Sequence, residues 1–196
     1  MTDIATTYTM TLPAWLVAEA DALPTTLATN EERMALVNQL ADRNWREGNG
    51  GPFAAIVVDE GTGELVSVGV NVVLSTGITS GHAEVMALAL AQQKLGRWNL
   101  GEGGARLSLI VNWRPCVQCY GATMWSGVRS LVVAGHGPEL EELTGFDEGP
   151  VVEDWDEQFR ERGIDVTIGV AREEALAVYR AYGAAENLVY NARGED

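Results

Sequence analysis

Three residues that could bind a metal ion lie in two short motifs of this sequence. Cys116 and Cys119 share the segment Pro115-Cys116-Val117-Gln118-Cys119, and His82 precedes them along the chain. Three protein ligands of this kind leave the fourth position of a tetrahedral zinc ion open for water, as in catalytic sites. The alternatives are a redox pair of cysteines or two small buried hydrophobic residues. Together with His82, the spacing favours a catalytic zinc site.

Glu84 lies two residues after His82 and is not needed as a ligand. A free carboxylate beside a zinc ion can take the proton of a bound water and pass it to a substrate, which is worth roughly 10²–10⁴ in rate. The alternative is a structural role, because acidic residues in a first helical turn complement the helix dipole. Next to a zinc ligand, we favour the catalytic role for Glu84.

The segments that must position these residues alternate between strand and helix patterns. Apolar runs predict strands at 53–58, 65–71, 107–111, 130–134 and 164–169. Helical patterns cover 13–22, 30–47, 84–95, 116–125, 154–162 and 172–182, with Asn30 as the expected N-cap of the second. This order predicts one domain with helices packed on a largely parallel sheet. The zinc ligands would lie at helix N-termini, where the dipole favours thiolates.

The charge of the chain narrows the class of substrate. The 196 residues include 13 Lys and Arg against 28 Asp and Glu, for a formal net charge of -15. Nucleic-acid binding requires basic residues that displace counterions from phosphates. We therefore expect a small neutral substrate and no nucleic-acid partner. No apolar run reaches the roughly 18 residues of a membrane span, so no membrane partner is expected. Cysteines committed to a metal instead of disulfides favour a reducing cytoplasm.

The combination of His82-Ala83-Glu84 with Pro115-Cys116-x-x-Cys119 resembles the cytidine deaminase-like superfamily. Residues 51–55, Asn71 and residues 125–146 resemble its bacterial guanine deaminases, and residues 145–150, 162–164 and 190–193 resemble those that also accept the triazine ammeline. The resemblance implies a three-layer α/β/α fold with a five-stranded mixed sheet and one zinc per subunit. It also implies hydrolytic deamination of guanine or a related triazine, with release of ammonia. Because it covers the chain from residue 30, it implies one deaminase domain over 30–196, with 1–29 as an N-terminal extension.

The same resemblance implies roles for residues that the spacing does not single out. Asn71 and the backbone N–H of Ala83 would hydrogen-bond the base, and Phe53 would pack near its ring. Glu148 would reach an amino or ring N–H group, and Tyr190 is a further pocket candidate. The family also implies a homodimer in which exchanged C-terminal segments complete the partner's active site.

One segment departs from the family pattern. Asn112-Trp113-Arg114 stands where Ser or Thr, a variable residue and Glu usually precede Pro-Cys. Trp113 and Arg114 could line the pocket or pack behind the residues that line it, which leaves the substrate open to another aminated ring such as a pterin, a cytosine-like base or a nucleoside. Less favoured alternatives are a tRNA adenosine deaminase and a non-catalytic, zinc-stabilised binding module.

Overall fold

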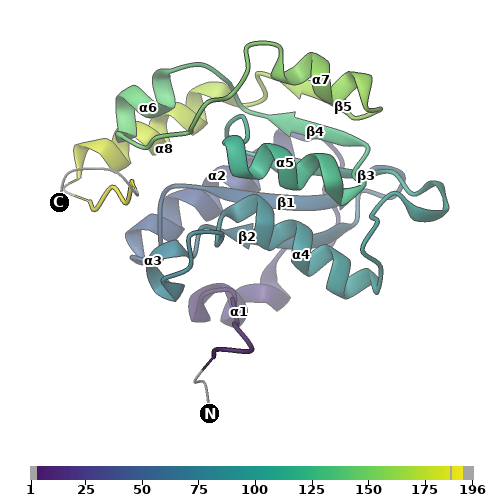
Figure 1. Cartoon of the computed structure of the whole chain (residues 1–196), viewed down its shortest axis with the longest axis horizontal. Coiled ribbons are helices and arrows are strands. Elements are labelled where there is room, and N and C mark those ends of the chain that lie inside the picture. Colours follow the sequence, from purple (N-terminus) through teal and green to yellow (C-terminus); the bar gives the residue numbers. More distant parts are fainter. Residues whose placement is uncertain (1–3, 186, 192–196) are drawn as a thin grey trace.

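The computed structural model of this chain describes residues 4–185 and 187–191. Its five strands are β1 (Ala54–Asp59), β2 (Leu65–Val70), β3 (Leu107–Val111), β4 (Ser130–Val133) and β5 (Asp165–Ile168). The helices are α1 (Ala14–Glu19), α2 (Asn30–Arg46), α3 (Val73–Thr76), α4 (Ala83–Leu95), α5 (Val117–Ser126), α6 (Glu139–Thr144), α7 (Trp155–Glu161) and α8 (Arg172–Ala184), with 3-10 turns at Ala20–Ala22 and Glu102–Gly104 (Figure 1). Ala192 and Arg193, which end the expected C-terminal motif, lie outside the described residues.

The five strands form one mixed sheet in the order β2-β1-β3-β4-β5. β1 pairs antiparallel with both β2 and β3, whereas the pairs β3–β4 and β4–β5 are parallel. The expectation of a largely parallel sheet was therefore wrong for half of the sheet. A tight turn after Asp59 makes β1 and β2 a hairpin, and the chain then crosses back through α4 to the other side of β1. The mixed sheet implied by the resemblance is confirmed.

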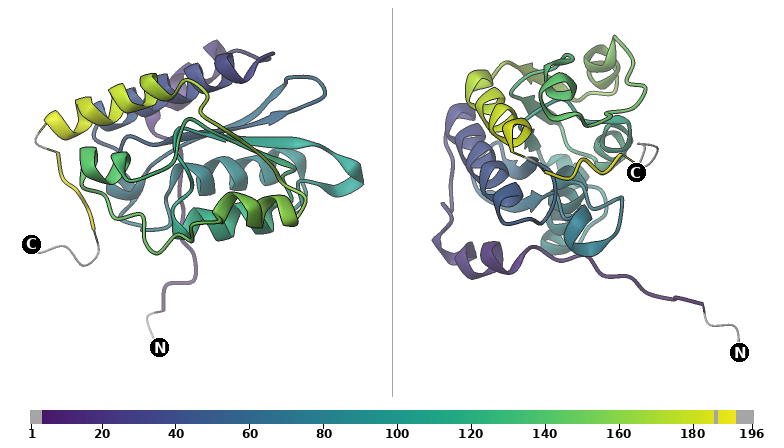
Figure 2. Two further views of the ribbon diagram at one scale, coloured as in Figure 1. Left: turned by 90° about the horizontal axis from the view of Figure 1, so that it is seen from above. Right: turned by 90° about the vertical axis from the view of Figure 1, so that its left-hand side faces the viewer.

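Helices cover both faces of the sheet and give three layers. α2 and α8 lie on one face, and α4, α5 and α7 lie on the other (Figures 1 and 2). Two hydrophobic clusters fill the spaces between the layers, because alternate residues of the central strands point to opposite faces. Ile56 and Val58 belong to the cluster under α2 and α8, and Ala55 and Val57 to the cluster under α4 and α7.

The start of α2 corrects one detail of the sequence interpretation. Thr29, and not Asn30, is the N-cap, and its hydroxyl accepts a hydrogen bond from the N–H of Glu32 at 3.2 Å. The Glu32 carboxylate accepts the N–H of Thr29 in return, at 3.1 Å. This is a complete capping box, which satisfies two N–H groups that a helix start otherwise leaves free. None of the helices in residues 4–185 is long and apolar enough to cross a membrane.

Candidate active site

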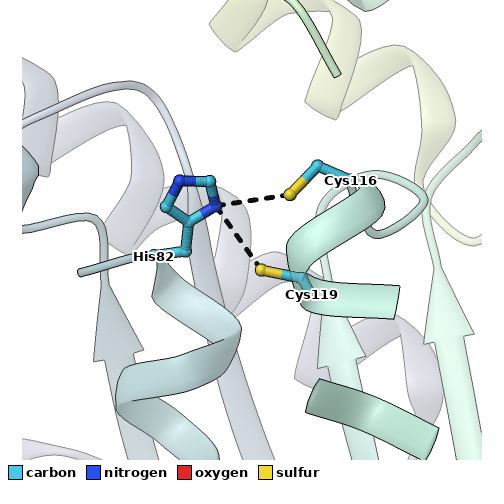
Figure 3. Close-up of side chains that lie close together, drawn as sticks. All are labelled: His82, Cys116 and Cys119. Carbon is cyan, nitrogen blue, oxygen red and sulfur yellow. Dashed lines mark hydrogen bonds between the residues drawn. The ribbon is translucent and has the colours of Figure 1, made fainter. Parts of the chain in front are cut away.

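Three potential metal ligands meet where α4 and α5 begin. His82 is the N-cap of α4, Cys116 is the N-cap of α5, and Cys119 lies in the first turn of α5. Nδ1 of His82 is 3.4 Å from Sγ of Cys116 and 3.5 Å from Sγ of Cys119 (Figure 3). The ligand edges of a tetrahedral zinc site with these atoms are about 3.5 Å long. The donor set and its spacing therefore fit a zinc ion held by these three side chains.

The sheet brings the two helix starts together. β2 and β3 run in the same direction on either side of β1, so the segments that leave their carboxyl ends emerge at one edge of the sheet. α4 follows β2, and α5 follows β3. This edge, at the carboxyl ends of strands, is where open α/β sheets commonly bind ligands.

The protein environment favours a thiolate at one of the two cysteines. Hydrogen bonding from Cys119 lowers the pKa of Cys116 to about 4 despite burial, and His82 acts in the same direction. Burial and the neighbouring negative groups raise the pKa of Cys119, so this thiol keeps its proton when no cation is bound. A divalent cation reverses this preference, because metal binding requires deprotonated sulfur.

Glu84 lies in the first turn of α4 and is only 6% exposed. Burial raises its pKa, and the nearby Cys116 thiolate raises it further, whereas His82 and Cys119 act in the opposite direction. A buried carboxyl group beside the potential metal ligands, with its pKa moved toward neutrality, has the properties of a proton carrier.

Glu148 reaches the same group of residues from the loop after α6. Its backbone oxygen accepts the N–H of Val117 at 3.0 Å, which holds the loop over the start of α5. Burial raises the pKa of its carboxyl group to about 8, with the negative charges of Cys116 and Glu84 as further causes. This carboxyl group is therefore protonated at neutral pH when no cation is bound.

Asn71, at the end of β2, has its side chain fixed by two donors. Its Oδ1 accepts the N–H of Val73 at 3.1 Å and the hydroxyl of Tyr190 at 2.8 Å. The Tyr190 hydroxyl in turn accepts the N–H of Gly51 at 2.8 Å. Because both lone pairs of Oδ1 are in use, the Nδ2 group of Asn71 is the part of the amide left to donate to a ligand.

Aromatic residues enclose this end of the site. The ring of Phe53 lies 5.4 Å from Phe146, and Phe146 lies 4.9 Å from Tyr190. Ala83 is buried at the first position of α4. Its N–H has no acceptor within the helix, as for every residue of a first turn. Phe53, Tyr190 and Ala83 thus lie at the same edge of the sheet as the potential metal ligands.

Trp113 does not line the site, contrary to expectation. It is 1% exposed and packs edge-on against Tyr179 of α8 at 5.5 Å, so its bulk fills the core under α8. The Arg114 side chain is largely covered, with Nη2 3.9 Å from a carboxylate oxygen of Glu141. Its positive charge lowers the pKa of Glu148, although burial and the nearby negative charges outweigh it. Of the two residues, only Arg114 is electrostatically coupled to the site.

Two buried asparagines support the site and were not identified as such from sequence. Nδ2 of Asn112 donates to the backbone oxygen of Pro52 at 2.9 Å, and its Oδ1 accepts the N–H of Ala54 at 3.3 Å. Nδ2 of Asn44, on α2, donates to the backbone oxygen of Asn71 at 2.8 Å. These bonds fix the backbone on both sides of Phe53 and at Asn71. The only sequence signal was a polar residue at an otherwise apolar position.

Comparison with known proteins agrees with this arrangement. Residues 27–135 match the cytidine and deoxycytidylate deaminase zinc-binding region. A guanine deaminase of Bacillus subtilis is 30% identical over 125 residues, which cover 64% of this chain and 76% of that protein. The solved guanine deaminase from Nitrosomonas europaea is 40% identical, with a TM-score of 0.86 over 93% of this chain and 99% of the other. A further solved structure, in complex with 2,6-diaminopurine, is 42% identical, with a TM-score of 0.85 over 95% of this chain and 97% of that one.

The fold and the zinc-ligand set define a zinc-dependent deaminase of mixed α/β architecture. The chain belongs to the cytidine and deoxycytidylate deaminase family, and guanine deaminases are among its most similar relatives. His82, Cys116 and Cys119 form a possible metal site within the matched region.

Proposed function

We propose that this protein hydrolyses guanine to xanthine and ammonia, with ammeline or a related triazine as a possible second substrate. The observation that carries the proposal is the meeting of His82, Cys116 and Cys119 at one point, with Glu84 buried beside them. The relatives support the choice of base, because two of them are guanine deaminases and a solved structure of a similar chain is a complex with 2,6-diaminopurine, an aminated purine.

The three ligands would hold one zinc ion per subunit, which when bound lowers the pKa of a water molecule. Glu84 would take the proton of that water and deliver it first to the ring nitrogen beside the amino-bearing carbon. The resulting hydroxide would add to this carbon, and Glu84 would then carry its remaining proton to the departing amino group, which would leave as ammonia. Its raised pKa suits this role, because a general acid and base works best near the operating pH.

The substrate contacts are proposals as well. Nδ2 of Asn71 would donate to an acceptor atom of the base, since its Oδ1 is occupied by Val73 and Tyr190. The N–H of Ala83 would donate to the ring carbonyl oxygen, and Phe53 would cover the ring. Glu148, beside Glu84 in the same chain, would contact an amino or ring N–H group of the base.

We propose a catalytic domain over residues 30–196 and a cytoplasmic location, which keeps both thiols reduced.

We also propose a homodimer. Exchange of C-terminal segments stays a prediction, and the contact of Tyr190 with Gly51 and Asn71 of its own chain supports an alternative in which each chain completes its own site. Heterodimers of a Glu84→Gln chain and a Tyr190→Ala chain separate the two. Activity returns on mixing only if segments are exchanged.

Ammonia release from guanine, ammeline, cytosine, adenine, pterins and nucleosides tests the function. We expect the highest kcat/KM with guanine and no ammonia release from nucleosides. A higher value for a pterin or for cytosine would replace guanine as the substrate, and no ammonia from any compound, with zinc bound, would support the non-catalytic alternative. Deamination of a transfer RNA would support the remaining alternative, which the charge of -15 disfavours.

A further inference from the structure

The N-terminal arm, residues 4–12, has the pattern of a strand but pairs with no strand among residues 4–185 and 187–191. Four of its five even positions are the larger apolar residues Ile4, Tyr8, Met10 and Leu12, and the odd positions hold only Ala and Thr. In an extended chain, alternate residues point to the same side. One side of the arm is therefore apolar. Residues 4–18 also contain no charged side chain, in a chain with a net charge of -15.

The apolar side of the arm begins on the body of the protein and continues past it. Leu12 and Met10 pack against the hydrophobic cluster of their own chain. Tyr8 is 73% exposed and Ile4 is 69% exposed. Two large apolar residues thus extend a packed surface to positions where the described part of the chain leaves them mostly exposed.

The arm leaves the body on the side of the sheet that α4 and α5 cover. In the right-hand view of Figure 2, α2 and α8 lie on one side of the molecule, and the arm extends beyond the opposite side. On that side α5 contains no charged residue, and Glu84 of α4 is buried. Trp125, at the end of α5, is 85% exposed, and Trp98, after α4, is 78% exposed. Tryptophan is enriched at protein interfaces relative to the rest of the surface.

We propose that the arm docks on the α4–α5 face of a second copy of this chain. Arm and face lie on the same side of one molecule, so a two-fold axis would place each arm on the face of the other copy. The arm and α5 carry no charged residue, and Lys94 at the end of α4 is paired with Glu64, so two acidic chains meet there with little repulsion. Residues 4–9 span about 20 Å when extended, which is enough to cross from one copy to the next. Tyr8 is the expected anchor, since aromatic residues dominate interface energies. The proposal is independent of the reaction and of any C-terminal exchange.

Cross-linking between copies tests the contact directly. A photoreactive phenylalanine derivative at position 8 is introduced into the full chain, and ¹⁴N-labelled and ¹⁵N-labelled proteins are mixed before irradiation. We expect mass spectra with links between light and heavy chains, on peptides that contain Trp98 or Trp125. Links only within one copy, links to other surfaces, or no links would each overturn the proposal.

The alternation of the arm gives a matched control for affinity. Tyr8→Ser should weaken dimerisation by roughly 30-fold, as for loss of an interface anchor. Thr7→Ser and Thr9→Ser, on the other side of the same arm, should leave the dimerisation constant unchanged. Sedimentation equilibrium measures all three, and circular dichroism confirms that the variants fold. Equal effects of Tyr8→Ser and Thr7→Ser, or a wild-type protein that is monomeric at every concentration, would contradict the proposal.

Discussion

The two faces of the sheet differ in what their helices contribute. On one face, α4 and α5 supply the potential zinc ligands and Glu84 at their first turns, and α5 carries no charged residue. On the other face, α2 and α8 are rich in charged residues on the outside. Two of their inward polar groups bond to backbone: Asn44 to Asn71, and Tyr179 to the oxygen of Asn112 at 3.0 Å.

The residues proposed to react and the residues that hold the backbone rigid thus lie in different parts of the molecule. The groups proposed to touch the reacting atoms lie at helix starts, where free N–H groups and the helix dipole adjust their charge. The groups that hold the backbone around the pocket are buried amides and a hydroxyl. Each of them bonds to a backbone atom that would otherwise lack a partner. Substitutions on the first face should therefore change chemistry with little change in stability, and those on the second should change stability and binding.

The largest expected effect comes from the zinc ligands. Removal of zinc by a chelator, or Cys116→Ala, should abolish ammonia release, because His82 and Cys119 alone do not retain the ion. Added zinc should restore the chelated wild type but not the variant. Atomic absorption should find one zinc per wild-type chain. Gln118→Ala, at the exposed position between the cysteines, is the matched control and should keep both metal and activity. Stoichiometric zinc in Cys116→Ala would contradict the assignment.

Glu84→Gln should lower kcat by about 10²–10⁴ and leave zinc content unchanged, because an amide cannot carry the proton. The folded protein raises the pKa of Glu84 and so favours its uncharged form, which Gln resembles. The melting temperature should therefore stay the same or rise. Glu142→Gln, at an exposed position on α6, should change neither quantity. A Glu84→Gln enzyme with full turnover would exclude Glu84 as the proton carrier.

The sequence predicted one of these two faces better than the other. The zinc ligands and Glu84 were identified because metal chemistry needs particular residue types at particular spacings. The predicted helices and strands agreed with the structure to within about two residues, because burial imposes a period on the sequence. The short helices α3 and α6 were not predicted. The antiparallel pairing of β1 with β3 was missed, since pairing between strands that are distant in sequence leaves no local pattern.

The supporting residues were missed for a related reason. Asn44 and Asn112 act on backbone atoms that are distant in sequence, and an isolated Asn reads as an ordinary polar residue. Trp113 was placed in the pocket because it lies two residues before Pro115. Its side chain instead points to the core under α8. The direction of the chain after β3 decides this, and the sequence pattern does not show that direction.

Among the residues that support the site, Asn112→Ala should destabilise the protein by about 2–4 kcal/mol, because it leaves the oxygen of Pro52 and the N–H of Ala54 buried without a partner. KM should rise as Phe53 loses its fixed position. Asn38→Leu is the matched control. Asn38 is also a buried asparagine, on α2, but its side chain has no hydrogen-bond partner in the described part of the chain. Its replacement should be neutral or stabilising in urea unfolding. An equal loss in Asn38→Leu, which breaks no hydrogen bond of the described chain, would mean that broken hydrogen bonds do not explain the cost of Asn112→Ala.

The smallest expected effect lies where the C-terminal segment meets the site. Tyr190→Phe keeps the ring against Phe146 but removes the hydroxyl that joins Gly51 to Asn71. Without the Tyr190 hydroxyl as a donor to Oδ1, the Asn71 amide is free to rotate and to turn its oxygen, instead of Nδ2, toward the substrate. KM should rise about tenfold, the worth of one hydrogen bond, with kcat nearly unchanged.

Tyr182→Phe is the control for this variant, because its hydroxyl bonds to the oxygen of Leu188, in the same segment, but does not reach Asn71. Steady-state kinetics on guanine compare the two. A rise in KM for Tyr190→Phe alone means that the segment acts by orienting one amide. Equal rises would instead mean that it acts by packing, and the proposed donor role of Asn71 would then lose its structural basis.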